Sequence, residues 1–293
     1  MRTWILVNPN AGSVDEQTAL EETLDRLPDT EVHHTEREGH AEELAREALY
    51  AGVEQVVAAG GDGTLNEVVN GLSEDFGRAR LGLLPLGTGN DFARSIQVPD
   101  DLEGALAVLR EGRTRRVDVA RATLQSRSRY FINMSAGGFS GLVSEKADGV
   151  KDRWGPLAYM RAAVDALPEL RTFKAAIRLS GAEELDLETY NLVISNGRFV
   201  AGGIPAAPQA ELDDGLLDLM IVPATTAPKL ALLVPQVLLG RHLGSDLLTF
   251  RKATRIEIES DPPMAFNLDG ELLDEAPSSF EVLPRALEVV VGE

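Results

Sequence analysis

The chain has 293 residues, 44% of them hydrophobic, so it can bury a sizeable core and is long enough for one large or two modest domains. It contains no cysteine, which excludes disulfides, thiolate metal sites and cysteine nucleophiles. Its net charge of -19 argues against a nucleic-acid partner, because such binding rests on clustered Lys and Arg that neutralise phosphates.

The first 120 residues alternate short apolar runs with helical patterns, which is the order expected of a parallel sheet flanked by helices. We expect strands at residues 3–7, 31–34, 55–58 and 81–84. We expect helices at residues 14–27, 42–50, 66–72 and 91–96, the last two opening directly after glycine-rich segments.

From about residue 117 the pattern changes to strand-like runs separated by turn-rich segments, which predicts an all-β module with a few helical insertions. The expected strands are residues 116–120, 130–135, 175–179, 191–195, 216–222, 255–259 and 287–291. The expected helical insertions are residues 156–170 and 229–240. We place a domain boundary near residue 120.

No segment reaches the roughly 20 apolar residues of a membrane-spanning helix, and the start of the chain lacks the features of a signal peptide. The sequence therefore predicts a soluble, cytoplasmic protein. The charge disfavours stable adhesion to anionic lipid, so membrane contact is expected to be peripheral and transient. The apolar run 230–239 leaves three alternatives open: a bilayer contact, buried core or the contact of a homodimer.

Three glycine-bearing turns follow predicted strands: NPNAGS at 8–13, GGDGTLNEVVNGL at 60–72 and LGTGNDFAR at 86–94. Open α/β sheets bind ligands at the carboxyl ends of their strands. Gly60, Gly61 and Gly63 let a ligand approach the backbone, and the following helix offers unpaired N–H groups, so the second turn predicts a phosphate cradle. The alternative is an ordinary strand-to-helix turn that Asp62 or Thr64 caps.

Two other phosphate-binding patterns are missing. Neither glycine segment completes G-x-G-x-x-G, and G-x-x-x-x-G-K-[ST] does not occur in the chain. A dinucleotide dehydrogenase and a P-loop nucleotidase are therefore both excluded.

Two acidic turns lie further along the chain. In NLDGE at 267–271, Glu271 could take a proton from an attacking hydroxyl and Asp269 could hold charge near a metal, if this turn faces the glycine segments. In ELDDG at 211–215 the oxygen-rich side chains suit Mg²⁺. The alternative in each case is a β-turn without further function.

Together these motifs, with VDVA at 117–120, resemble the diacylglycerol-kinase catalytic family, specifically its soluble bacterial lipid-kinase branch. They occur in the family's order from Asn8 to Glu271. NAD kinases and phosphofructokinase-like enzymes share the glycine-Asp-glycine-Thr element. The segment NEVVNG at 66–71, the GTGNDFAR loop and the terminal NLDGE resemble the lipid branch.

The resemblance implies an α/β plus all-β fold. Residues 1–120 would form a Rossmann-like, nucleotide-binding α/β domain similar to NAD kinase and phosphofructokinase, and the tail 280–293 is a candidate to rejoin it. Residues 121–279 would form a β-sandwich-like domain for the lipid substrate. ATP and the acceptor lipid would meet in a cleft between the two.

The resemblance also implies roles for single residues. The ATP contacts would be Asn8, Thr35, Gly60, Gly61, Asp62, Gly63, Thr64, Leu65, Asn66 and Thr88. The general base would be Glu271, and a charge network around the transferred phosphate and catalytic Mg²⁺ would use Asp62, Asp91, Asp118 and Asp269. A second, structural Mg²⁺ would be bound by the Asp214 side chain and by backbone oxygens of Glu211 and Leu216.

One departure from the family concerns charge. Many relatives carry a lysine just after the first turn, where this chain has Ser13, so Arg94 or Arg161 is expected to supply the cation. The predicted activity is transfer of the ATP γ-phosphate to a lipid hydroxyl, with diacylglycerol as the default acceptor. The alternatives are a kinase for a soluble acceptor such as NAD, and a non-catalytic lipid- or nucleotide-binding regulator.

Overall fold

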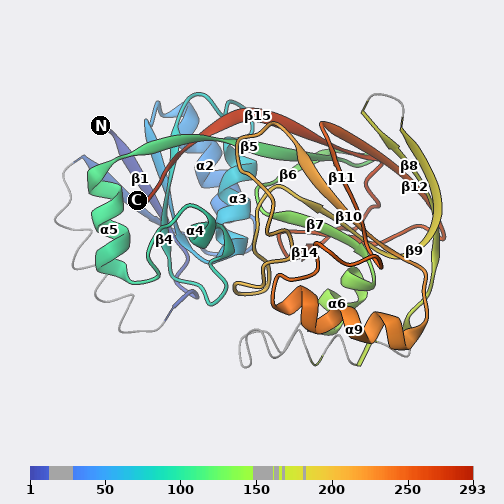
Figure 1. Cartoon of the computed structure of the whole chain (residues 1–293). Coiled ribbons are helices and arrows are strands. Elements are labelled where there is room, and N and C mark those ends of the chain that lie inside the picture. Colours follow the sequence, from blue (N-terminus) through green and yellow to red (C-terminus); the bar gives the residue numbers. More distant parts are fainter. Residues whose placement is uncertain (13–28, 148–160, 162–164, 167–168, 181–182, 293) are drawn as a thin grey trace. The chain divides into compact units, whose positions relative to one another are not determined.

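The computed structural model describes all residues except 13–28, 148–160, 162–164, 167–168, 181–182 and 293. The chain forms two compact units (Figure 1). Unit 1 is Met1–Asp118 with Arg285–Glu293, and unit 2 is Val119–Pro284. The predicted helix 14–27 and most of the predicted insertion 156–170 lie outside the described residues.

Unit 1 contains a parallel sheet in the order β15-β4-β3-β1-β2. Its strands are β1 (Thr3–Val7), β2 (Thr30–His34), β3 (Gln55–Gly60), β4 (Arg80–Pro85) and the last residues of β15 (Ser279–Val290). Every residue of β1 and β3 is buried, as expected of apolar strands covered on both faces. The predicted α/β fold of this unit is confirmed.

The helices of unit 1 connect these strands. They are α2 (His40–Tyr50), α3 (Asp62–Leu72), α4 (Asp91–Ser95) and α5 (Leu102–Glu111). The sequence placed the start of α3 at Asn66, but the helix begins four residues earlier. Gly61 is its N-cap, with extended backbone (φ -93°, ψ -169°), so Gly63 lies inside the first turn rather than in a loop.

Two contacts hold α3 against α2. A Cβ on Gly71 would lie 2.4 Å from the carbonyl oxygen of Glu42, so only glycine allows this close approach. The carboxylate of Glu67 accepts hydrogen bonds from the N–H groups of Gly39 and Ala41, both at 2.9 Å. A side chain of α3 therefore caps the first turn of α2.

Unit 2 is built almost entirely of antiparallel strands. They are the last residues of β5 (Thr114–Thr123), β6 (Ser128–Phe131), β7 (Met134–Gly138), β8 (Phe173–Leu179), β9 (Glu184–Ser195), β10 (Leu217–Pro223), β11 (Thr249–Ala253), β12 (Arg255–Asp261), β13 (Phe266–Leu268), β14 (Glu271–Leu272) and the first residues of β15. The main order is β14-β13-β7-β9-β8-β12-β15. The helices α6 (Phe139–Ala147) and α9 (Ala227–Leu238) are added to these strands.

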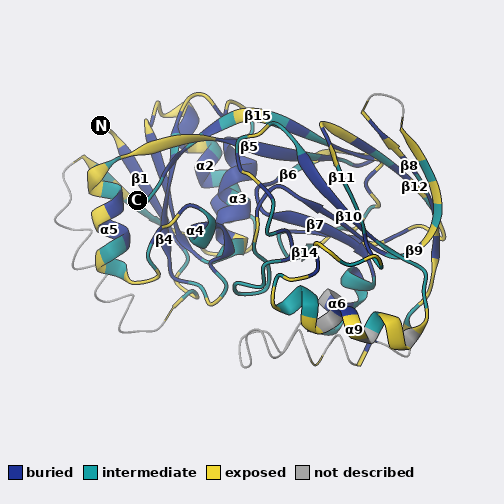
Figure 2. Ribbon diagram, in the orientation of Figure 1, coloured by how far each residue is buried: buried dark blue, intermediate teal, exposed yellow. Residues whose placement is uncertain are grey.

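The long strand β9 gives unit 2 its sandwich-like character. Its first half pairs with β8, and its second half pairs with β7 and β10. Burial alternates along β8, so one face packs into a core that includes the rings of Phe131, Phe266 and Phe280. Figure 2 shows β7 and β10 coloured mostly as buried. The predicted all-β module is confirmed.

Some predicted elements of unit 2 differ from the structure. The predicted strand 130–135 is two strands, β6 and β7, because Ile132 and Asn133 between them donate their N–H groups to Asp269 rather than to a neighbouring strand. The last predicted strand, 287–291, belongs to the much longer β15. Among the described residues, no helix combines the length and apolar character needed to cross a membrane.

Candidate active site

Asn8, Thr35 and Gly60 lie side by side at the carboxyl edge of the parallel sheet. The strands that they end or follow are in register there, with Val7 of β1 opposite His34 and Ala59. From β1 the chain continues to β2 on one side, and from β3 it continues to β4 on the other side. The edge between β1 and β3 is therefore a topological switch point. Open α/β sheets bind ligands at such points.

The start of α3 packs against the end of β1. Asn8 Nδ2 donates a hydrogen bond to Thr64 Oγ1 at 3.1 Å. A Cβ on Gly60 would lie 2.5 Å from the same Thr64 oxygen, so glycine is required at that position. Because the N-cap residue Gly61 has no side chain, it cannot cap the first N–H groups of α3, which a helix leaves without internal partners.

The two glycine segments of unit 1 meet backbone to backbone. A Cβ on Gly87 would lie 2.5 Å from the Cα of Gly61, and one on Gly89 would lie 2.5 Å from Asp62 Oδ2. The N–H of Asp91 donates to Asp62 Oδ1 at 3.0 Å. The structure therefore brings Asp62 and Asp91 together at the openings of α3 and α4.

Asn90 holds the second loop in shape. Its backbone is left-handed (φ 50°), a conformation that Asn tolerates better than most residues. Its side-chain oxygen accepts the Gly87 N–H at 3.1 Å, and its Nδ2 donates to the Gly87 carbonyl at 2.8 Å. Asn90 is not among the predicted site residues, although an Asn after a glycine pair is a signal for this geometry.

The two arginines proposed as phosphate partners lie in different surroundings. Arg94 donates to the carbonyl of Gly89 at 2.9 Å and lies 3.6 Å from Asp91, so its guanidinium is part of the second loop. Arg161 is well exposed and pairs with Asp165 at 3.6 Å. Of the two, Arg94 belongs to the cluster around the glycine segments.

The remaining predicted ATP contacts differ in exposure. Gly63 is exposed in the first turn of α3, and Thr88 is exposed on the loop before α4. Leu65 and Asn66 are buried, and the side-chain oxygen of Asn66 accepts a hydrogen bond from Asn70 at 3.1 Å. The side chains of Leu65 and Asn66 therefore belong to the interior of α3.

Asp118 is fully buried in unit 1. Its Oδ1 accepts the N–H of Arg285 at 2.6 Å, where Arg285 has a left-handed backbone (φ 49°). This contact joins β5 to the returning end of the chain, a structural role that the sequence did not suggest.

In unit 2, Glu271 follows a two-residue hairpin turn. Leu268 of β13 lies opposite Glu271 of β14, and the residues between them, Asp269 and Gly270, have φ of 47° and 94°. Positive φ at both central positions is the signature of a type I′ turn, which Asp-Gly favours. The turn thus sets the position of Glu271.

Asp269 anchors this turn to the rest of unit 2. Its carboxylate accepts N–H groups of three successive residues, Ile132 at 3.2 Å, Asn133 at 3.1 Å and Met134 at 2.9 Å. Its own N–H donates to the Met134 carbonyl at 2.9 Å. Asp269 therefore fixes the turn that carries Glu271 to residues 132–134, which are far away in the sequence.

The acidic turn before β10 already holds an internal cation. Asp214 Oδ1 accepts the Leu216 N–H at 3.0 Å, and its Oδ2 accepts Lys252 Nζ at 2.8 Å. Lys252 also lies 3.3 Å from the buried Asp218. Glu211 is exposed nearby in the sequence. Oxygen donors suited to Mg²⁺ are present, but a metal would compete with Lys252 for Asp214.

The pKa values of this cluster reflect its burial. Burial raises the pKa of the Asp218 carboxyl, and the Lys252 ammonium opposes that shift. Burial alone would lower the pKa of Lys252, but its hydrogen bond to Asp214 and the charge of Asp218 outweigh burial and raise it. Within the described residues, no group of three or more His, Asp or Glu side chains is arranged to hold a metal.

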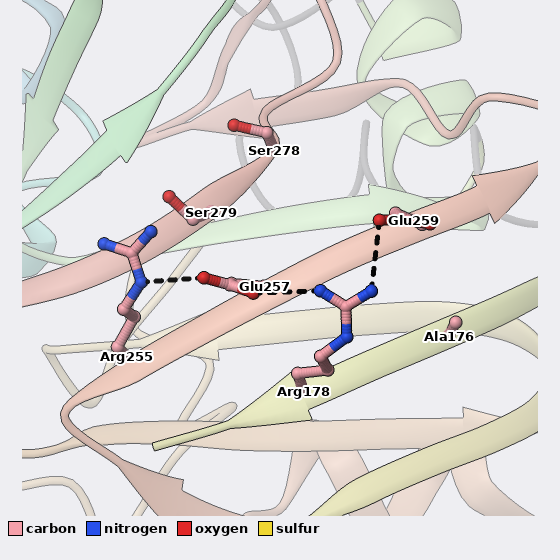
Figure 3. Close-up of a pocket in the computed structure, with 7 residues that line it drawn as sticks. All are labelled: Ala176, Arg178, Arg255, Glu257, Glu259, Ser278 and Ser279. Carbon is pink, nitrogen blue, oxygen red and sulfur yellow. Dashed lines mark hydrogen bonds and ion pairs between the residues drawn. The ribbon is translucent and has the colours of Figure 1, made fainter. Parts of the chain in front are cut away.

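A shallow pocket of about 190 Å³ lies on β8, β12 and β15 of unit 2 (Figure 3). Arg255 donates to Glu257 at 3.0 Å, and Arg178 donates to Glu257 at 3.2 Å and to Glu259 at 3.4 Å. The hydrogen bond from Arg255, with further help from Arg178, lowers the pKa of Glu257. Both arginines are therefore paired with carboxylates in a ladder of surface charges. None of the predicted site residues lines this pocket.

Comparison with known proteins assigns both units to one family. Residues 2–122 match the model of the diacylglycerol kinase catalytic domain, and residues 133–291 match that of the YegS C-terminal NAD kinase beta sandwich-like domain. A protein named diacylglycerol kinase from Staphylococcus aureus (strain MRSA252) is 34% identical to this chain, over 98% of this chain and 91% of its own length. The chain belongs to the diacylglycerol kinase family.

Other members of the diacylglycerol kinase family are similar over the whole chain. The diacylglycerol kinase of Staphylococcus haemolyticus is 34% identical, over 97% of this chain and 86% of its own length. A crystal structure of a putative diacylglycerol kinase from Bacillus anthracis superposes with a TM-score of 0.83 at 26% identity and covers 99% of this chain and 97% of that one. The predicted family is confirmed, and the chain is a lipid kinase.

The candidate site residues occur in both matched segments. The glycine loops, with Asp62 and Asp91, lie in the matched catalytic domain. The hairpin with Asp269 and Glu271 lies in the matched sandwich-like domain.

Proposed function

We propose that this lipid kinase transfers the γ-phosphate of ATP to the hydroxyl of diacylglycerol or a closely related lipid. The names of its relatives support the acceptor class. The single observation that supports the site best is the junction of the two glycine segments, where Gly61 meets Gly87 and Asp62 accepts the N–H of Asp91.

The phosphates of ATP would lie on the backbone of this junction. The glycines let the two backbones pack directly on each other, since a Cβ on Gly87 would lie 2.5 Å from the Cα of Gly61 and one on Gly61 would lie 3.3 Å from the Cα of Gly87. The N-terminus of α3 favours an anion, and Arg94 places a guanidinium beside the second loop. The other proposed ATP contacts are Asn8, Thr35, Gly60, Asp62, Gly63, Thr64, Leu65, Asn66 and Thr88.

Phosphoryl transfer needs positioning and charge neutralisation more than covalent chemistry. Mg²⁺ would arrive with ATP as part of the substrate and neutralise phosphate charge. Asp62 and Asp91 are oxygen donors on the loops that would face it. We assign the other carboxylates of the predicted network, Asp118 and Asp269, to holding β5 and the hairpin in place.

The acceptor hydroxyl must lose its proton as the new O–P bond forms. We assign this proton to Glu271, which the type I′ turn holds partly exposed at the start of β14. A positioned carboxylate can take up this proton in the transition state, as the O–P bond forms.

The second, structural Mg²⁺ that the resemblance implies remains a separate prediction. Asp214, with backbone oxygens of Glu211 and Leu216, would hold it, but Lys252 already neutralises the Asp214 carboxylate. We therefore expect this turn to be ordered without a metal.

The test is to incubate the protein with labelled ATP and with a panel of acceptors, in Mg²⁺ and in chelator. The panel contains diacylglycerol, phosphatidylglycerol, a sphingoid base, an undecaprenyl-type alcohol and NAD. We expect the label to appear in diacylglycerol or one related lipid, and only in the samples that contain Mg²⁺ without chelator. Label in NAD would overturn the lipid assignment, and the lack of both transfer and ATP binding would favour a non-catalytic regulator.

A further inference from the structure

The outer face of α9 in unit 2 is apolar. Pro228, Leu232, Pro235 and Leu239 are all exposed, and their spacing of four, three and four residues places them on one stripe of the helix. Leu232 and Leu239 are each 64% exposed, and Leu243 just beyond the helix is 44% exposed. Figure 2 shows exposed segments along α9. Solvent-facing stripes of surface helices normally carry charged residues.

The inner face of the same helix is apolar as well. Leu230 and Leu233 pack on a cluster that includes Met134, Met220 and Leu248. A helix that is apolar on opposite faces is normally covered on both. At 12 residues α9 is too short to span a bilayer, so a partner at its outer face must lie along it.

The segment of sequence that contains α9 differs in charge from the strongly acidic chain as a whole. Between Asp218 and Asp246 there is no acidic residue, although about one residue in six of the chain is acidic. Lys229 and Arg241 lie at the two ends of the helix and are exposed. Within the part of the chain that the structure describes, neither cation pairs with a carboxylate.

We propose that α9 docks this enzyme on the surface of a bilayer that contains anionic phospholipid. The leucine and proline stripe would enter the boundary between headgroups and acyl chains, and Lys229 and Arg241 would reach the phosphates beside it. This inference rests on the proposed function, because a kinase whose acceptor is a lipid must meet a membrane.

The net charge makes this contact oriented and brief. Attraction between the two cations and the bilayer acts within a Debye length of about 8 Å, so it is felt when α9 faces the surface. A chain with net charge -19 is repelled in other orientations. The enzyme would therefore bind by one face and release readily.

A homodimer is the other partner that an apolar face suggests, but α9 is too small for it. A 12-residue helix is about 18 Å long and about 10 Å wide, much less than the roughly 800 Å² that each partner buries in a standard interface. The exposed cations at both ends would also face a like-charged copy. Lipid headgroups complement them.

Sedimentation with vesicles of phosphatidylcholine, with and without phosphatidylglycerol, tests the proposal. We compare the wild type with the variant Leu232→Ser/Leu239→Ser, the variant Lys229→Gln/Arg241→Gln, and the control Tyr50→Ser, whose side chain is 70% exposed in unit 1. Kinase activity is measured on diacylglycerol in vesicles and on a short-chain diacylglycerol in solution.

We expect the leucine variant to lose vesicle binding on the order of tenfold or more, and the charge variant to lose the preference for phosphatidylglycerol. Activity on vesicles should fall in parallel, and activity on the short-chain lipid should stay unchanged. Unaltered vesicle binding by the leucine variant, or a wild-type dimer that this variant dissociates, would overturn the proposal. Correct vesicle binding without phosphorylation of either lipid would instead contradict the proposed function.

Discussion

The carboxylate of Asp62 and the backbone N–H of Asp91 form a 3.0 Å hydrogen bond that joins the two glycine loops of unit 1. The carboxylate therefore has two separable properties, an acceptor oxygen for the second loop and a negative charge for the metal-bound nucleotide. Substitutions at Asp62 can distinguish them.

We expect Asp62→Ala to lower kcat by about 10²–10⁴ with the fold intact, since catalysis here depends on positioning and charge. Asp62→Asn keeps an oxygen that can accept the Asp91 N–H but removes the charge. If charge matters, both variants lose turnover while only the alanine variant loosens the loops, seen as faster hydrogen exchange at Asp91. Near-wild-type turnover of the asparagine variant would refute the catalytic charge.

Glu271→Gln should lower kcat by about 10²–10⁴ without changing ATP affinity, because it removes the proposed proton acceptor and keeps the size of the side chain. The matched control is Asp274→Asn in the same segment, an exposed carboxylate paired with Arg127. Its turnover should match the wild type. Equal turnover of Glu271→Gln and the control would remove the base role from Glu271.

Asp269→Ala should lower the free energy of unfolding by about 3 kcal/mol or more, because three backbone N–H groups lose a charged acceptor and alanine is strained at φ 47°. Asp269→Asn should cost less, since one oxygen still accepts and Asn tolerates this backbone. Urea unfolding of both variants measures the difference. A stable but inactive alanine variant would indicate a chemical role instead of anchoring.

Lys252→Met leaves Asp214 and the buried Asp218 without their shared cation, and should cost about 1–3 kcal/mol near neutral pH. Burial raises the pKa of Asp218, so its folded state binds a proton more tightly than its unfolded state. The variant should therefore regain stability as the pH falls through that raised pKa.

The same variant tests the second metal at Asp214. We expect the melting temperature of the wild type to be the same in Mg²⁺ and in chelator, and that of Lys252→Met to rise with Mg²⁺ as the ion takes the place of the ammonium. A wild type that chelator destabilises in the absence of ATP would show that the turn does need a metal.

Arg255→Gln tests the charge ladder of Figure 3. In the wild type, the hydrogen bond from Arg255 lowers the pKa of Glu257 in the folded state. The stability that this bond contributes is therefore present above the unfolded pKa of Glu257, and it is lost as the pH falls through the lower folded pKa. The variant should unfold at lower urea than the wild type at neutral pH, and the difference should narrow as the pH falls through the lowered folded pKa of Glu257. High salt should also reduce this difference in urea midpoint. If the difference changes with neither pH nor salt, the effect of the substitution comes from packing and not from charge.

Which elements form was largely determined by the sequence, because burial periodicity is a local property. Fully apolar runs such as Thr3–Val7 predicted buried strands, and the later turn-rich pattern predicted the all-β unit. The family motifs indicated the glycine segments and Glu271 as candidate site residues without any knowledge of the groups that contact them. The predicted start of α3 was wrong because glycine usually indicates a loop, whereas here Gly61 caps the helix and Gly63 lies in its first turn.

Which groups contact one another was decided by the tertiary structure. The hydrogen bonds between Asp269 and residues 132–134, between Glu67 and the start of α2, and between Lys252 and Asp214 all join segments that are distant in sequence. Such pairs depend on strand order and register, which no local pattern encodes. The apolar run 230–239 shows the same division: the sequence determined its character, and only burial revealed that Leu232 and Leu239 face outward while Leu233 faces the core.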